Sequence, residues 1–157
     1  MKQKVYIETS VISYLTSLPS RDIVTAARQQ VTRDWWKEFR QQFEIYISAL
    51  VLEEAKGGDS SAANKRLDAL DGIPILKITD EAEKLATGLV KSDLVSKRHS
   101  EDALHIALAT VNGMDFLLTW NFNHINNEIL KKGIAKVAKK YGLECPIICS
   151  PEELIGE

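Results

Sequence analysis

Short apolar runs alternate with helix-like segments along the whole chain, and this alternation constrains the fold more than any other feature. Strands are expected at 5–7, 43–48, 73–78, 116–119 and 147–148. Helices are expected from about 11, over 22–42, 49–56, 64–70, 81–95, 101–111 and 123–141, and in a final turn after 150. Strands separated by helices are typical of parallel sheets covered on both faces. The sequence therefore predicts an α/β fold with a central, mostly parallel sheet of four to five strands flanked by helices on both faces.

Several helix ends carry recognisable capping residues. Thr9 or Ser10 is expected to cap the first helix, and Ser100 the helix over 101–111. Ser150, followed by proline, is expected to cap the last turn. Gly133 is expected to interrupt the helix over 123–141.

The length and composition indicate one domain spanning 1–157. A chain of 157 residues is long enough to bury a core, and it contains no internal repeat. The most linker-like stretch, 57–63, is short enough to be a loop rather than a domain boundary.

Charge and apolar patterning narrow the functional classes. The 20 basic and 22 acidic residues give a net charge of −2, which argues against a protein that simply coats nucleic acid. It is compatible with a nuclease, because acids gathered around a metal lower the net charge. No membrane span or secretory signal is evident, and Cys145 and Cys149 are expected to be reduced thiols, so we expect a cytoplasmic protein without a membrane partner.

Polar residues follow several of the expected strands. Ligands of open parallel sheets bind outside the carboxyl ends of the strands. Glu8 directly follows the first strand, Asn121 lies just past the fourth, and Glu53 and Glu54 lie on the helix after the second. Asp102 lies in the first turn of a helix that follows a serine. These groups are expected to converge at one end of the sheet.

Each of these acids also has an ordinary structural interpretation. Asp102 begins an almost wholly apolar helix, where an acid is costly unless it is paired or bound to metal. It could instead meet the positive end of the helix dipole or pair with Arg98. His105, one turn further on, is expected to be a packed core residue.

Glu53 and Glu54 point about 100° apart on a helix, so only one can face a pocket, and the residues alone do not choose between them. The alternative for this pair is a solvated helix flank. The alternative for Glu8 is a salt bridge with a nearby lysine.

Four segments together resemble the PIN-domain ribonucleases, particularly the VapC-like toxins of toxin–antitoxin pairs. They are IETSVISYL (7–15), SALVLEEA (48–55), EDALHIALA (101–109) and LLTWNFNHI (117–125). The closing IICSPEEL is also similar, and the resemblance runs from residue 4 to about 155. It implies a PIN-like domain.

The resemblance also implies a set of site residues. Glu8 stands where the family has aspartate, and Glu54, six residues after a serine, is selected over Glu53. Asp102 matches the third acid, and Asn121 stands where aspartate is common. Glu8 keeps the charge with a reach longer by roughly 1.5 Å, whereas Asn121 keeps an oxygen and loses the charge.

The implied activity is metal-dependent endoribonuclease cleavage that leaves 5′-phosphate and 3′-hydroxyl ends. Glu8, Glu54 and Asp102 would hold Mg²⁺ or Mn²⁺, with Asn121 completing the catalytic set and able to hold a metal-bound water. Supporting hydroxyls would orient carboxylates or phosphate; these are Thr9, Ser10 and Thr119. The acids suffice for one metal ion.

The implied partners are RNA, a second copy of the chain in a homodimer, and an antitoxin whose tail fills the acidic groove. The candidate RNA contacts are Arg33, Lys37 and Arg40 at i, i+4 and i+7, the pair Lys97 and Arg98, and the lysines at 131, 132, 136, 139 and 140. The alternative for each is solvated surface. No aromatic platform for base stacking is evident.

Two other classes compete with a nuclease. Glu8 and Asn121 also suit a catalytically inactive PIN-fold module that binds RNA or protein. A response-regulator-like receiver would need a phosphorylatable aspartate after a central strand and a lysine after a late one, and no such pair is evident.

Overall fold

A five-stranded, wholly parallel sheet forms the centre of the computed structural model, which describes residues 1–156. The strand order is β3-β2-β1-β4-β5. The strands are β1 (Lys4–Ile7), β2 (Glu44–Ser48), β3 (Ile75–Leu76), β4 (Phe116–Leu118) and β5 (Ile147–Cys149). The predicted fold class is confirmed, while the last residue of the predicted domain, 157, lies outside the described residues.

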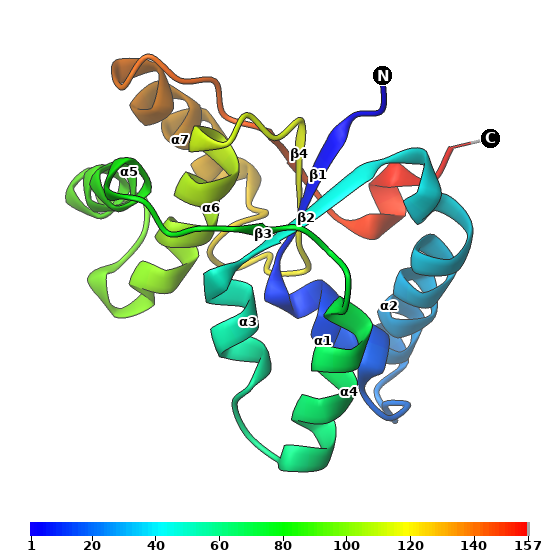
Figure 1. The fold of residues 1–157 in the computed structure, drawn as a ribbon. Helices are drawn as coiled ribbons and strands as arrows, with labels where there is room; N and C mark the ends of the chain where they lie inside the picture. Colours follow the sequence, from blue (N-terminus) through cyan, green and yellow to red (C-terminus); the bar gives the residue numbers. More distant parts are fainter. Residues whose placement is uncertain (157) are drawn as a thin grey trace.

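Helices cover both faces of the sheet. They are α1 (Thr9–Thr16), α2 (Ile23–Asp34), α3 (Ala49–Ala55), α4 (Ser60–Leu70), α5 (Asp80–Lys91), α6 (Ser100–Val111) and α7 (Glu128–Lys140). Figure 1 shows α5, α6 and α7 together on one side of the sheet, and α1, α2 and α4 on the other. None of the helices in this described part of the chain has the length and apolar character needed to cross a membrane.

The central strand β1 explains why this layering is stable. Val5 pairs with Ile45 of β2 on one side and with Phe116 of β4 on the other. Val5, Tyr6 and Ile7 are fully buried. A strand covered on both faces can carry a continuous run of buried residues, as this one does from Val5 to Ile7. Its carboxyl end therefore projects the next residue, Glu8, from the middle of the sheet.

Two predicted elements around the second crossover differ in length. The strand expected over 73–78 is reduced to the two residues of β3 at the sheet edge, although the Pro74 carbonyl still accepts a hydrogen bond from the Ile47 amide. The helix expected from 64 already begins at Ser60, because the Asp59 side chain accepts a hydrogen bond from the Ala62 amide. The predicted loop over 57–63 is correspondingly shorter.

The two longest predicted helices are also corrected. Regular α-helix over 22–42 ends at Asp34 and continues as a π-helical turn, η1 (Trp35–Phe39), and a 3-10 turn, η2 (Arg40–Gln42). The helix expected over 123–141 begins only at Glu128 and runs through Gly133 without interruption. A Cβ at Gly133 would lie 2.5 Å from Leu94, so the glycine allows a close approach within a continuous helix.

The capping predictions are partly confirmed. Ser150 caps the 3-10 turn η4 (Pro151–Leu154) and forms a capping box with Glu153. Glu8, rather than Thr9 or Ser10, caps α1. Ser100 is already inside α6, which follows a 3-10 turn, η3 (Lys97–His99), and begins without a side-chain cap.

Candidate active site

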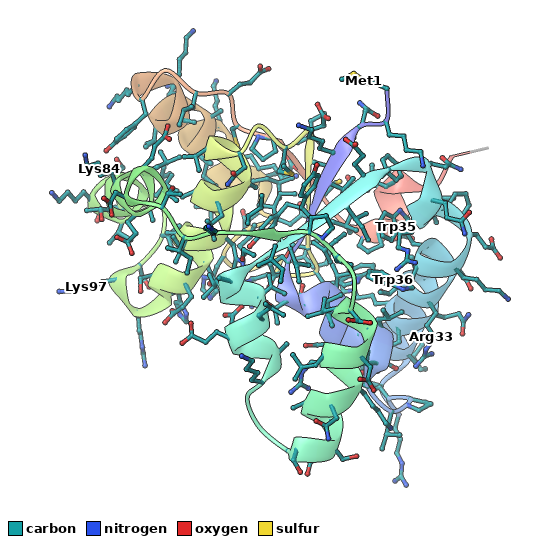
Figure 2. The ribbon with its side chains drawn as sticks, in the orientation of Figure 1. Met1, Arg33, Trp35, Trp36, Lys84 and Lys97 are labelled. Carbon is teal, nitrogen blue, oxygen red and sulfur yellow. The ribbon has the colours of Figure 1, made fainter. Side chains whose placement is uncertain are left out.

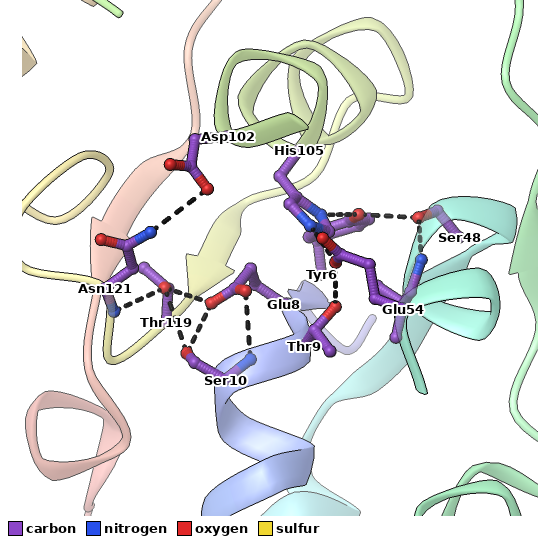
Figure 3. Close-up of polar contacts among 11 residues, drawn as sticks. Tyr6, Glu8, Thr9, Ser10, Ser48, Glu54, Asp102, His105, Thr119 and Asn121 are labelled. Atoms are coloured by element: carbon purple, nitrogen blue, oxygen red, sulfur yellow. Dashed lines mark hydrogen bonds and ion pairs between the residues drawn. The ribbon is translucent and has the colours of Figure 1, made fainter. Parts of the chain in front are cut away.

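Glu8 is held at the carboxyl end of β1 by three hydrogen bonds. Its Oε2 accepts from the Ser10 amide at 3.0 Å. Its Oε1 accepts from the hydroxyls of Ser10 and Thr119, each at 2.5 Å (Figure 3). The side chain is buried, and these donors compensate for the loss of water around its charge. No ion pair found among residues 1–156 joins Glu8 to a lysine.

Glu54, rather than Glu53, faces the same end of the sheet. The Ser48 side chain accepts from the Val51 amide at the start of α3, which sets the rotation of this short helix. Glu54 Oε1 then lies 2.5 Å from the Thr9 hydroxyl and 2.7 Å from Nε2 of His105. Glu53 is exposed.

His105 is both a core residue and a partner of the acidic group. Its ring is almost fully buried, and Nδ1 lies 2.7 Å from the Tyr6 hydroxyl, which in turn lies 2.8 Å from the Ser48 hydroxyl. A continuous polar chain therefore runs from Ser48 through Tyr6 and His105 to Glu54. The sequence pattern predicts His105 only as a core residue. Its position one turn after Asp102, on the same helix face, is the feature of the sequence that indicates a place beside the acidic residues.

Protonation of the Glu54–His105 pair follows from this contact. Burial alone would raise the pKa of Glu54, but the hydrogen bond and positive charge of His105, together with the Thr9 hydroxyl, lower it below its usual value. Burial alone would lower the pKa of His105, but the hydrogen bond to Glu54 and the charges of Glu8, Glu54 and Asp102 raise it. Each partner thus favours the charged form of the other.

Asp102 lies in the first turn of α6 and is held by Asn121. Nδ2 of Asn121 donates to Oδ1 of Asp102 at 3.2 Å, and the amide oxygen of Asn121 accepts from the His124 backbone at 3.0 Å. Asn121 therefore presents N–H rather than oxygen to Asp102, which differs from the oxygen-ligand role expected of it. Burial raises the pKa of Asp102, and the Glu8 charge adds to this against the opposing effects of His105, His124 and His99. No ion pair with Arg98 is present in the described chain.

The structure divides the predicted carboxylates between two neighbouring groups. Donor atoms of Glu8, Glu54 and His105 lie within 4.8 Å of one another. Donor atoms of Asp102 lie instead within 4.8 Å of those of His99 and His124. Figure 3 shows Glu8 between Asp102 and Glu54. The three carboxylates thus line one edge of the sheet without forming a single tight cluster.

An aromatic and cationic group beside the carboxylates was not expected from the sequence. The guanidinium of Arg28 lies 4.8 Å from the ring centre of Phe122 and 5.6 Å from that of Trp120. Trp120 is tied to the site because its amide donates to the Ser10 hydroxyl at 2.9 Å. Phe122 is 37% exposed and directly follows Asn121. Only the tertiary structure brings Arg28 of α2 to this edge.

The predicted basic contacts lie in different parts of the molecule. The π-helical turn interrupts the expected stripe on the second helix: Arg33 donates to the Ser17 carbonyl at 3.3 Å, and Arg40 stacks 4.5 Å from the ring centre of Trp36. Lys97 is exposed, immediately before His99 and α6, as is Arg98. Figure 2 shows Arg33 and Lys97 on opposite sides of the molecule, so the two sets do not form one surface.

A five-stranded parallel sheet with this helix arrangement is the fold of a PIN domain. Among solved structures, the chain is similar to one in the crystal structure of VapBC2 from Rickettsia felis bound to a DNA fragment from their promoter. The match has a TM-score of 0.60 and 16% sequence identity, and it covers 94% of this chain and 98% of the other. No protein-family model and no curated protein matches the sequence. The resemblance predicted from the four segments is confirmed at the level of the fold.

Proposed function

We propose that this chain is a metal-dependent endoribonuclease of the PIN type. The observation that carries the proposal is the alignment of Glu8, Glu54 and Asp102, from three distant segments, along the carboxyl edge of a PIN-like sheet. Hard divalent cations take oxygen ligands, and Mg²⁺ in proteins is commonly held by one or two carboxylates together with water and substrate phosphate oxygens.

The residues present fit a divalent cation. The lowered pKa of Glu54 keeps that carboxylate ionised, and donor atoms of Glu8 and Glu54 already lie within 4.8 Å of each other. Glu8, Glu54 and Asp102 would hold Mg²⁺ or Mn²⁺. When bound, the cation supplies a water of lowered pKa as nucleophile and neutralises charge on the phosphoryl oxygens.

The surrounding side chains position these carboxylates. Ser10 and Thr119 hold Glu8, and Thr9 holds Glu54. His105 donates to Glu54 from the core, and Asn121 donates to Asp102. Such partners fix the orientation of metal-binding groups before substrate arrives.

The same edge offers contacts for RNA. The partly exposed ring of Phe122 provides a face for stacking of a base, and Arg28 beside it provides a charge for a phosphate. Lys97 and Arg98 are exposed immediately before α6, the helix that carries Asp102, and would provide further contacts for phosphate groups. These side chains support single-stranded RNA as the substrate.

The partner proposals rest on the similar structure and on the predicted family resemblance. That structure contains VapBC2 bound to promoter DNA. By analogy, we infer that this chain is the toxin of a toxin–antitoxin pair, acts in the cytoplasm, and forms a homodimer. Light scattering of the purified chain, alone and co-expressed with the product of the adjacent reading frame, tests both associations.

A catalytically inactive binding module is the second candidate. It is favoured by the three internal hydrogen bonds that Glu8 accepts and by the N–H group that Asn121 turns toward Asp102. This candidate predicts RNA affinity that a chelator does not change.

Cleavage of unstructured RNA in Mg²⁺ or Mn²⁺ tests the nuclease proposal. Asp102→Asn is expected to lower the initial rate at least about 100-fold, because it removes a charge from the site. Glu101→Gln is the matched control, since Glu101 is the exposed neighbour on the same helix, and it is expected to cleave normally. EDTA should abolish cleavage by the unmodified protein and by the Glu101→Gln control. Intact RNA with the unmodified protein, free of any co-purifying partner, would favour the binding module.

A further inference from the structure

Two histidines and Asp102 form a second group of metal-ligand type beside the carboxylates. His99 ends the 3-10 turn before α6, Asp102 lies one turn further along, and His124 lies in the loop between β4 and α7. One donor atom from each lies within 4.8 Å of the others, and all three side chains are half-buried. Three segments of the fold thus bring these donors together at an accessible position.

The imidazole rings of this group are close to each other and have no polar partner within the described chain. Their ring centres are 4.0 Å apart, with planes 23° from parallel. Among the hydrogen bonds and ion pairs of residues 1–156, none involves the ring of His99 or of His124. By contrast, both ring nitrogens of the chain's third histidine, His105, are hydrogen-bonded. His99 and His124 therefore keep lone pairs available for a cation.

Asn121 arranges this group in advance. Its side-chain oxygen accepts from the His124 amide, and its side-chain nitrogen donates to Asp102. One side chain thus fixes the loop that carries a histidine relative to the carboxylate. Outer partners of this kind raise metal affinity because the ligands need less ordering on binding.

The donor set differs chemically from that of the carboxylate edge. Two imidazole nitrogens and one carboxylate oxygen suit borderline ions such as Zn²⁺ and Co²⁺, whereas Mg²⁺ prefers oxygen ligands alone. Three protein ligands also leave a coordination position for water or a substrate oxygen.

We propose that His99, Asp102 and His124 bind a divalent transition-metal ion, at a site separate from the Glu8, Glu54 and His105 group. The site shares Asp102 with the proposed nuclease centre. The proposal otherwise stands without nuclease activity, because it rests on the donors alone.

Binding of Co²⁺ and Zn²⁺ to the full-length chain, without RNA, tests this site. Co²⁺ should give visible d–d absorption that saturates at one equivalent, and Zn²⁺ should abolish it while excess Mg²⁺ does not. His124→Ala and His99→Gln should each weaken Zn²⁺ binding in calorimetry at least about tenfold. Glu101→Gln is the matched control, because Glu101 is the exposed neighbour of Asp102 on the same helix and should leave this affinity unchanged. Circular dichroism and thermal unfolding establish that each variant is folded.

Three outcomes would overturn the proposal. One is a folded wild-type chain that does not bind Zn²⁺ or Co²⁺. Another is binding that is lost in Glu54→Gln and kept in both histidine variants, which would place the ion at the Glu8, Glu54 and His105 group. The third is binding that survives both histidine changes and disappears after thiol alkylation, which would assign it to the cysteines. Because these measurements contain no RNA, a protein without nuclease activity can still confirm the metal site.

Discussion

Glu53 and Glu54 are chemically identical neighbours, and yet their environments differ. The Glu54 side chain is hydrogen-bonded to His105 and Thr9, whereas among residues 1–156 the Glu53 side chain makes no hydrogen bond or ion pair. The difference arises because consecutive helical residues point about 100° apart and the cap at Ser48 sets which of them faces the sheet edge. The sequence could present the choice, but only the resemblance to a family selected Glu54.

Glu54→Gln is expected to reduce metal-dependent RNA cleavage at least about 100-fold, because it replaces a charged ligand by a neutral one. Glu53→Gln, one residue away, is expected to stay within about twofold of the unmodified rate. Initial rates at saturating Mn²⁺ measure both. Equal losses in the two variants would show that Glu54 has no special part in the reaction.

His105 is expected to stabilise the fold as well as the site. His105→Leu removes one hydrogen-bond partner from the Tyr6 hydroxyl and one from Glu54, and it should lower the free energy of unfolding by about 1–3 kcal/mol. His99→Ala serves as control, because the His99 ring makes no hydrogen bond in the described chain. Urea unfolding in EDTA separates this effect from metal binding. A loss no larger than that of His99→Ala would contradict the role assigned to the polar chain.

Among the elements, the short helix α3 depends most on its cap. Seven residues form few internal hydrogen bonds, so a helix of this length relies on its ends and its packing. The Ser48 hydroxyl is buried, contacts the Val51 amide, and lies 2.8 Å from the Tyr6 hydroxyl. The cap therefore links the position of Glu54 to the central strand.

Ser48→Ala is expected to cost about 1–2 kcal/mol in unfolding free energy, because it leaves a helix amide and a buried tyrosine hydroxyl short of a partner. Ser60→Ala, at the exposed first position of α4, should change stability little. Chemical denaturation of both variants measures the difference. If the two changes cost the same, the cap on α3 does not have the importance argued for it.

At the scale of the whole molecule, burial makes the two free thiols report on global unfolding. Cys149 of β5 is 2% exposed, and burial raises its pKa to about 12, with the Glu153 charge adding to the effect. Burial likewise raises the pKa of Cys145 to about 11. Both thiols remain protonated, and therefore poorly nucleophilic, at neutral pH.

At pH 8, modification of Cys149 by a thiol reagent is expected to be slow in the native protein and fast in denaturant. The pKa of Cys149 is higher in the folded protein than its usual value of 9.0, so ionisation of this thiol favours the unfolded state. The stability that comes from keeping the thiol protonated is therefore intact below pH 9.0 and is lost as the pH rises toward about 12. The rate at which the thiol reagent reacts is measured in the Cys145→Ser variant, in which Cys149 is the remaining thiol. Rapid native modification of Cys149 would show that β5 opens locally.

Much of the fold was predictable because hydrophobic periodicity is a local property of the chain. The apolar runs and the helix patterns predicted the parallel sheet, and the rule for strand ends placed Glu8 and Asn121 at its carboxyl edge. Boundaries were less accurate where local signals compete. The π-helical turn after Asp34 and the unbroken helix at Gly133 depend on packing against distant segments.

The detailed chemistry of the site was decided by tertiary packing alone. The pairing of Glu54 with His105, the grouping of Asp102 with His99 and His124, and the approach of Arg28 to Phe122 each join segments that are far apart in sequence. Such contacts depend on how helices sit on the sheet and on which rotamer each side chain adopts. Residue spacing in the sequence determines neither the placement of the helices nor the rotamers. The sequence therefore predicted which acids lie close together, but not which partner each acid contacts.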